Sequence, residues 1–347
     1  MKKQFSLLII SAVAIAAVFS GCADDKKDEQ TVSHLYSSGY YYDGFKDVPC
    51  YWVDTTRHNL AGDGTHNARA LSTVESNGFV YTAGFYSDGF KDIPCYWVDT
   101  TRHDLSGDGS HSAYASSISV LNSTVYTAGY YNDGSKDIPC YWTNATKQDL
   151  PAYGTNNARA FSIVLYNGSI YTAGYYNDGS KDIPCYWIDI SRQDLPGDGS
   201  YNAYAVSIAI SNGTVYSAGY YYDGLKNSPC YWTGTSMVPL TGDGAHYAAV
   251  SSIIVSNSTV YTAGFYNDGV KFNACYWVNT TKYDLPGDGI RSFATLITVI
   301  EGILYSFGYY ESSPKATACY WVGTIKHDMQ SDSYDSFSVT GGFSLQE

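Results

Sequence analysis

The sequence is poor in basic residues. Its 347 residues include 20 Lys and Arg against 33 Asp and Glu, a formal net charge of −13. Nucleic acids require a basic face on the proteins that bind them, so we exclude them as partners. The chain also lacks Cys-x-x-Cys pairs, Asp-x-Asp-x-Asp-Gly calcium loops and any Gly-x-Ser-x-Gly context for a nucleophile. We therefore predict no cofactor and no metal site, and we assign no catalytic residue.

Long apolar runs are also scarce. The single one is "FSLLIISAVAIAAVFS" at 5–20, which follows Lys2 and Lys3 and ends at the small residues Ser20 and Gly21. A basic start, a short apolar run and a small-residue site predict an export signal over 1–21. No other run approaches the ~18 apolar residues of a spanning helix. A plain secretory signal and an N-terminal membrane anchor are the alternatives.

The end of this segment, "FSGC", resembles a bacterial lipobox. The resemblance implies that the signal is cleaved and that Cys22 becomes the lipidated N-terminus. The charged stretch up to residue 31 then predicts a flexible tether. Ala23 follows Cys22, which is similar to lipoproteins sorted to the outer membrane. We expect a lipid-anchored protein of the cell envelope, at the outer membrane or cell surface rather than the inner membrane.

Helical periodicity is absent, and a repeat takes its place. Trp occurs only within Cys-Tyr-Trp, which appears seven times at spacings of 45 residues and once of 44. A fixed period of this length indicates a solenoid, propeller or array. The motif residues are Cys50 and Trp52, Cys95 and Trp97, Cys140 and Trp142, Cys185 and Trp187, Cys230 and Trp232, Cys275 and Trp277, and Cys319 and Trp321.

Each unit predicts four short strands, a to d, separated by Asn-Gly and Asp-Gly turns. In one unit they cover 117–122, 123–131, 138–144 and 146–150. The folded region begins in a strand b near residue 34, without a strand a before it, and ends in a lone strand a over 335–344. Matching partial ends predict a closed ring. We therefore predict an all-β fold over 32–347: a seven-bladed β-propeller of four-stranded antiparallel blades, in which the C-terminal strand a joins the N-terminal strands b, c and d.

The segment "NGTVYSAGYY" at 212–221 resembles a kelch strand, with Gly-Tyr where kelch repeats have Gly-Gly. The "AGYY…PCYW" unit is also similar to repetitive bacterial propeller lipoproteins. This resemblance covers nearly all of the chain after the signal, and implies the propeller fold without an activity.

The seven repeated cysteines occupy one position on successive blades. Blades pack about 10 Å apart, too far for a disulfide, which needs Cα atoms within ~7 Å. We expect buried thiols that pack with the tryptophans between blades as structural residues.

The b–c and d–a loops of a propeller share one face, the top face. The b–c loops repeat an Asp-Gly with a nearby Lys, and turn chemistry is the simplest explanation. The d–a loops repeat Gly-Asp-Gly, whose carboxylates form turns or an acidic ring at the channel mouth: Asp63, Asp108, Asp198, Asp243 and Asp288.

Near-identical units differ at two positions after that Asp. Three residues on stand His66, His111, Asn156, Tyr201, His246 and Arg291. Three further on stand Arg69, Tyr114, Arg159, Tyr204, Ala249 and Ala294. Drift at solvated sites is the simpler explanation of these differences. If the protein discriminates between ligands, we expect its specificity to be set at these positions.

Tyrosine pairs such as Tyr130 and Tyr131 suit a sugar, peptide or protein ligand, or else pack between blades. We expect a monomeric binding or scaffold module for a protein or glycan partner, held to a membrane by its lipid, and not an enzyme. A glycan hydrolase or lyase at the channel mouth and an envelope assembly scaffold are the alternatives.

Overall fold

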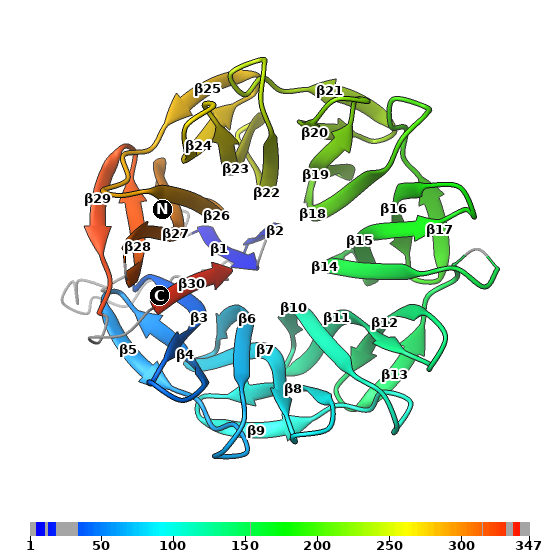
Figure 1. Ribbon diagram of the computed structural model, residues 1–347. Helices are drawn as coiled ribbons and strands as arrows, with labels where there is room; N and C mark the ends of the chain where they lie inside the picture. Colours follow the sequence, from blue (N-terminus) through cyan, green and yellow to red (C-terminus); the bar gives the residue numbers. More distant parts are fainter. Residues whose placement is uncertain are drawn as a thin grey trace.

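The computed structural model describes residues 5–10, 13–18, 34–152, 154–313, 315–330 and 336–340. These residues form seven four-stranded antiparallel sheets arranged in a ring, and a separate two-stranded hairpin (Figure 1). The described residues contain no helix, and hence none long and apolar enough to span a membrane. The predicted seven-bladed β-propeller is confirmed.

Strand a of each blade lies nearest the central channel and strand d at the outer rim (Figure 1). The a strands are β30 (Ser336–Thr340), β6 (Ala68–Ser76), β10 (Ala113–Leu121), β14 (Ala158–Tyr166), β18 (Ala203–Ser211), β22 (Ala248–Ser256) and β26 (Arg291–Ile300). The b strands are β3 (Tyr36–Tyr42), β7 (Phe79–Ser87), β11 (Thr124–Asn132), β15 (Ser169–Asn177), β19 (Thr214–Tyr222), β23 (Thr259–Asn267) and β27 (Ile303–Ser312). The c strands are β4 (Asp47–Val53), β8 (Asp92–Val98), β12 (Asp137–Thr143), β16 (Asp182–Ile188), β20 (Asn227–Thr233), β24 (Phe272–Val278) and β28 (Lys315–Val322). The d strands are β5 (Thr56–Asn59), β9 (Thr101–Asp104), β13 (Thr146–Asp149), β17 (Ser191–Asp194), β21 (Ser236–Pro239), β25 (Thr281–Asp284) and β29 (Ile325–Asp328). We number the blades from the one that contains β3 (blade 1) to the one that contains β26 (blade 7).

Blade 1 closes the ring as the sequence predicts, because β30 pairs with β3 in the order β30-β3-β4-β5. The seam between blades 7 and 1 also has its own bonds. Gln330 donates its backbone N–H to the Thr55 carbonyl (2.9 Å), and its own carbonyl accepts the Trp52 indole N–H (3.0 Å). Leu296 and Phe307 pack at this seam in a buried cluster with Trp52. The ends of the chain are therefore joined by strand pairing, hydrogen bonds and apolar packing together.

A glycine in strand b permits a bulge in strand a. In blade 3, the register of β10 against β11 shifts between Ala115 and Ser117. A Cβ added to Gly129 would lie 1.8 Å from the Tyr114 carbonyl oxygen, so no other residue fits there. This close approach explains the invariant glycine within the repeated "AGYY" and "AGFY" segments.

The repeated Cys and Trp side chains fill the layers between blades. All seven of each are fully buried, and the cysteines are thiols whose pKa burial raises where a shift is resolved, as at Cys140. Trp142 donates its indole N–H to the Ser106 carbonyl (2.9 Å), which belongs to the linker leaving the preceding blade. Nearer the axis, Ser117 Oγ accepts the backbone N–H of Ile163 from the next blade (3.3 Å). Each blade is thus bonded to both neighbours by its repeated residues.

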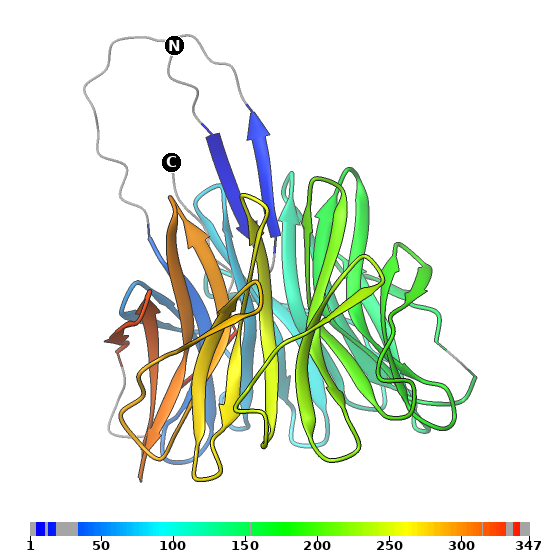
Figure 2. The ribbon, with the colours of Figure 1, turned by 90° about the horizontal axis from the view of Figure 1, so that it is seen from above.

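The N-terminal apolar segment forms a hairpin of β1 (Phe5–Ile10) and β2 (Val13–Val18) in the full chain. The hairpin lies against the inner strands β18 and β22, and leaves the ring on the side where β3 begins (Figure 2). Its removal as an export signal stays a prediction. Cys22 and the tether up to residue 31 lie outside the described residues.

Candidate binding site on the top face

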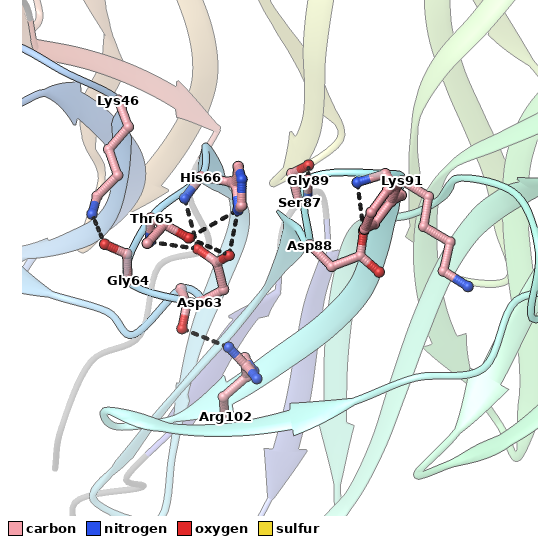
Figure 3. A network of polar contacts seen from close by, with 12 residues as sticks. Lys46, Asp63, Gly64, Thr65, His66, Ser87, Asp88, Gly89, Lys91 and Arg102 are labelled. Carbon is pink, nitrogen blue, oxygen red and sulfur yellow. Dashed lines mark hydrogen bonds and ion pairs between the residues drawn. The ribbon is translucent and has the colours of Figure 1, made fainter.

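The b–c loops are Asp-Gly turns that a lysine ties to the next blade (Figure 3). Asp88 Oδ1 accepts the backbone N–H groups of Phe90 and Lys91, both at 2.9 Å. The Lys46 ammonium donates to the Gly64 carbonyl, in the d–a loop that leads into blade 2. The same bond recurs at Lys91, Lys136, Lys181, Lys226 and Lys271. The repeated Asp and Lys residues therefore shape turns and link blades.

In the d–a loops, each repeated aspartate of blades 2, 3, 5 and 6 holds its own turn. Asp63 Oδ1 accepts the N–H groups of Thr65 (2.8 Å) and His66 (2.7 Å), and His66 Nδ1 lies 2.5 Å from Asp63 Oδ2 (Figure 3). The Asp–His pair recurs as Asp108–His111 and Asp243–His246, Asp198 caps its loop without a histidine, and Asp288 instead pairs with Lys326.

These contacts favour the ionised form of the aspartates. Burial opposes ionisation of Asp108, but the hydrogen bonds from His111 and Ser110 outweigh it and lower the pKa of Asp108 to about 2. The pKa of Asp243 falls to about 2 through the same opposition of burial and hydrogen bonds from His246 and Ala245. Among the described residues, no group of three His, Cys, Asp or Glu side chains is placed to hold a metal ion.

The first variable position packs against the Asp-Gly turn of its own blade. His66 lies so close to Gly89 that a Cβ there would be 2.8 Å from His66 Nε2. Gly89 has φ +92°, a backbone conformation that favours glycine, and a side chain there would displace the His66 ring. The equivalent contacts are His111 with Gly134, Asn156 with Gly179, Tyr201 with Gly224, and His246 with Gly269. This position therefore joins the two loops that build the top face of each blade.

The second variable position forms a polar bond across the blade boundary. Arg159 Nε donates to Asp137 Oδ2 of the preceding blade (2.7 Å), and its Nη2 lies 2.6 Å from the same oxygen. Tyr114 makes the equivalent bond with its hydroxyl, donated to Asp92 Oδ2 at 2.7 Å. Arg69 bonds Asp47 and Tyr204 bonds Asp182 in the same way. Arg and Tyr thus alternate at one structural position, and each donates to the aspartate at the equivalent position of the preceding blade.

Where the aspartate is missing, its partner changes too. Asn227 stands at the Asp position of blade 5, and Ala249 at the partner position of blade 6. At the next boundary both are aromatic: Phe272 and Phe293 have ring centroids 5.6 Å apart. The two positions vary together, which indicates a packing constraint rather than drift.

The prediction that Ala294 is the blade 7 equivalent of Arg69 is wrong by one residue. Ala294 pairs with Gly308 as Ala70 pairs with Gly84, so the equivalent of Arg69 is Phe293 and not Ala294. The spacing of 44 residues arises because the loop before strand β26 is one residue shorter than in the other blades. Arg291 is therefore also displaced by one position relative to His66 and its equivalents. That side chain bonds Glu311 within its own blade (2.7 Å) and not an aspartate of the d–a loop.

A belt of aromatic rings and two arginines follows the top-face end of the two inner strands, with Ala249 at the strand-a position of blade 6. We call it the aromatic belt, and it consists of the residue after each strand-b glycine with the strand-a residues between: Tyr40, Arg69, Phe85, Tyr114, Tyr130, Arg159, Tyr175, Tyr204, Tyr220, Phe265, Phe293 and Tyr309. Tyr114 shows the connection, with its ring centroid 5.0 Å from Phe85 in one blade and 5.0 Å from Tyr130 in its own. Arg159 lies 4.5 Å over the Tyr130 ring.

The second tyrosine of each pair packs inside the blade instead. Tyr131 donates its hydroxyl to Asp149 (3.1 Å), and the Lys147 ammonium lies 3.4 Å over its ring. Tyr176 has the same arrangement with Asp194 and Arg192. Of the pairs singled out from the sequence, one tyrosine therefore belongs to the aromatic belt and the other to structural packing.

A hollow of about 680 Å³ opens in the top face above blade 2. It brings together His66, Arg69 and Tyr114, which the sequence pattern singled out, with Phe85 and Asp92, which it did not. Phe45, from the b–c loop of blade 1, stands at its edge and is 92% exposed. Sequence reasoning missed Phe45 because it treated the loop tips as turn positions only, although the tips change from Phe to Ser between blades.

A larger space of about 970 Å³ lies at the opposite mouth of the channel. Its walls are the ends of the a strands, among them Leu165, Ile210 and Val255, and Asn-rich a–b turns. Among the described residues that line it, Glu301 is the one side chain with a formal charge at neutral pH. The hollow above blade 2 is smaller, but it combines rings with both signs of charge, so it is the better candidate for specific recognition.

The fold defines the class of protein: a seven-bladed β-propeller with its candidate site on the top face. No family model matches the sequence, and no curated protein matches it. The kelch-like type therefore stays a prediction.

Solved structures with a similar fold include three propeller-containing proteins of unrelated sequence. The β-propeller domain of the Trilobed protease from Pyrococcus furiosus has 11% identity and a TM-score of 0.47, over 87% of this chain and 98% of that one. A mutant Aleuria aurantia lectin in complex with Fucα1-6GlcNAc has 12% identity and a TM-score of 0.41, over 75% and 94%. A post-proline cleaving enzyme from Rickettsia typhi has 10% identity and a TM-score of 0.46, over 88% and 54%.

Proposed function

We propose that this protein is a lipid-anchored propeller of the cell envelope that binds a glycan or protein partner through its top face. The observation that carries the proposal is the aromatic belt beside an open hollow that is lined by both charged and aromatic side chains. Rings of this kind offer apolar area with little conformational freedom to lose, and the charged groups fix orientation.

The point at which the chain enters the ring is consistent with a top face that is directed away from the membrane. Strand β3 runs from the a–b turns toward the top face, and Tyr36 lies at its start. The chain therefore enters β3 on the face opposite the hollow. An anchor at Cys22 would therefore hold the a–b face toward the membrane and direct the top face away from it.

The hydrolase alternative gains no support from the hollow. Glycoside hydrolysis uses two carboxyl groups about 5–9.5 Å apart with separate roles. Asp92, which lines the hollow, is bonded to Tyr114, and the nearby Asp63 is bonded to His66. Both carboxylates already have structural partners that repeat in other blades.

Two experiments on the full-length protein in detergent test the proposal. A glycan array and a pull-down from envelope extract should give a ligand that competes with an antibody directed to the top-face loops. Absence of a ligand in both would contradict the proposal, and cleavage of a bound glycan would favour the hydrolase. Separately, Cys22→Ala should move the protein from the membrane to the soluble fraction, and persistent anchoring would refute lipidation.

A further inference from the structure

We propose that the hollow above blade 2 is a subsite for a neutral pyranose ring. This inference rests on the proposed function, binding through the top face, and adds where the ligand sits and what it is. Two features carry it: apolar rings set at right angles, and a donor and an acceptor beside them.

The apolar half of the subsite consists of Phe45, Phe85 and Tyr114. Phe85 and Tyr114 have ring centroids 5.0 Å apart at an interplanar angle of 81°, which makes a corner of two aromatic surfaces. Phe45 extends from the neighbouring loop at the edge of the same hollow. A pyranose has a face of C–H groups that packs on an aromatic ring, so such a corner fits one sugar ring.

The polar half consists of Arg69 and Asp92. Asp47 engages Arg69 through Nε and Nη2, which leaves Nη1 as a donor. Tyr114 engages Asp92 through Oδ2, which leaves Oδ1 as an acceptor. Neighbouring sugar hydroxyls both donate and accept, so an arginine donor with a carboxylate acceptor suits them.

The charges favour a neutral sugar over an acidic one. The hollow has Lys46, Arg69 and Asp92 in its lining, and the Asp47 carboxylate lies 2.6 Å from Arg69. The two cations are thus matched by two carboxylates, and a chain with a net charge of −13 supplies no wider attraction for an anion. A uronic acid or a phosphate would find no surplus positive charge.

The chain contains a near-copy of this arrangement two blades on. Arg159, Tyr204 and Asp182 repeat Arg69, Tyr114 and Asp92 with equivalent bonds. At the copy, Ser135 replaces Phe45 and the buried Tyr175 replaces Phe85. The proposal therefore depends on the residues that differ, and Phe45 is the most accessible of them.

The experiment uses Phe45→Ser, which gives the loop the residue of the near-copy. Phe90→Ser is the matched control, since Phe90 occupies the same place in the next b–c loop, is 99% exposed and does not line the hollow. Saturation-transfer NMR and titration would use methyl glucosides, galactosides and mannosides, with glucuronic acid as the acidic comparison. At least one neutral glycoside should bind, and Phe45→Ser should weaken it about fivefold to tenfold while Phe90→Ser leaves it unchanged.

The outcomes distinguish a failure of the pyranose subsite from a failure of the proposed binding function. If a glycan or protein ligand binds but Phe45→Ser has no more effect than Phe90→Ser, the subsite is refuted and the binding function stands. Preference for glucuronic acid would likewise overturn the neutral-sugar assignment. If the wild-type protein binds no glycoside and no partner in any assay, both fall. Equal loss in the two variants would indicate a general apolar surface and would also refute the subsite.

Discussion

The bond between Arg159 and Asp137 provides a direct test of how neighbouring blades hold each other. Asp137 is 8% exposed, so removal of Arg159 leaves a carboxylate that is largely buried. Among the described residues, Asn132 is then its one side-chain donor. A hydrogen bond to a charged group contributes about 1.5–3 kcal/mol, and we take the lower part of this range because the Arg159 side chain is 38% exposed. Arg159→Ala should therefore lower the free energy of unfolding by about 2 kcal/mol.

Two further substitutions copy what other blades already contain. Arg159→Tyr restores the donor found at Tyr114 and Tyr204, and should cost less than about 1 kcal/mol. The double variant Asp137→Asn with Arg159→Ala reproduces the pair Asn227 and Ala249. It should cost less than Arg159→Ala alone, because no buried charge is left without its partner.

The assay is equilibrium unfolding in urea of the full-length protein, followed by the fluorescence of the seven buried tryptophans. Arg291→Ala is the control, because Arg291 pairs with Glu311 within one blade and is 49% exposed. Its loss should cost no more than about 1 kcal/mol. The reasoning is refuted if Arg159→Ala costs no more than this control, or if Arg159→Tyr costs as much as Arg159→Ala.

Three other predictions follow from the same contacts. Gly129→Ala should destabilise the protein more than Gly109→Ala. A Cβ at Gly129 meets the Tyr114 carbonyl, whereas at Gly109 the only penalty is the positive φ of +90°, because a Cβ there meets nothing within 4 Å; equal urea midpoints would contradict the bulge geometry. Stability should fall above pH 10, because burial and the bond to Asp104 raise the pKa of Tyr86 to about 12, and burial and the bond to Asp194 raise that of Tyr176 to about 12. The stabilisation is present below the unfolded pKa of about 10 and is lost as the pH rises toward 12, so melting temperatures should decline over that interval, and less steeply in Tyr176→Phe. At the acid end, the lowered pKa values of Asp108 and Asp243, each about 2, stabilise the fold above pH 4, and melting temperatures that stay constant from pH 4 to pH 2 would argue against these loop bonds.

The fold could be predicted from the sequence because the motifs that define it recur at a fixed period. Seven Cys-Tyr-Trp motifs correspond to the seven blades, and the C-terminal strand β30 pairs with β3 to complete blade 1, as predicted. The turn chemistry of Asp-Gly and the packing of Trp could likewise be inferred from residue type. These features depend on local backbone preference and on burial, both of which can be inferred from residue type in a single sequence.

The site was only partly accessible, because its contacts join residues of different blades. Variation between copies drew attention to Arg69 and Tyr114, but the aspartates that explain it stand 22 residues earlier, on strand c of the preceding blade. The deletion before β26 also shifted the apparent alignment of Phe293 by one residue. Such pairings depend on register and on the rotation between blades, which the repeat length does not specify.

The repeat separates two requirements that usually compete. Residues that are the same in every blade, such as the strand-b glycine and the buried Trp, fix the backbone and the spacing between blades. Residues that vary in step, such as Arg159 with Asp137 or Ala249 with Asn227, preserve each boundary while changing its chemistry. The tips of the b–c loops vary without such a partner: Phe45 and Leu225 are at least 90% exposed, and serine stands at this position in blades 3 and 4. A change there alters the surface at little cost to the fold, which is why a difference in recognition between blades is most readily placed at Phe45 and its equivalents.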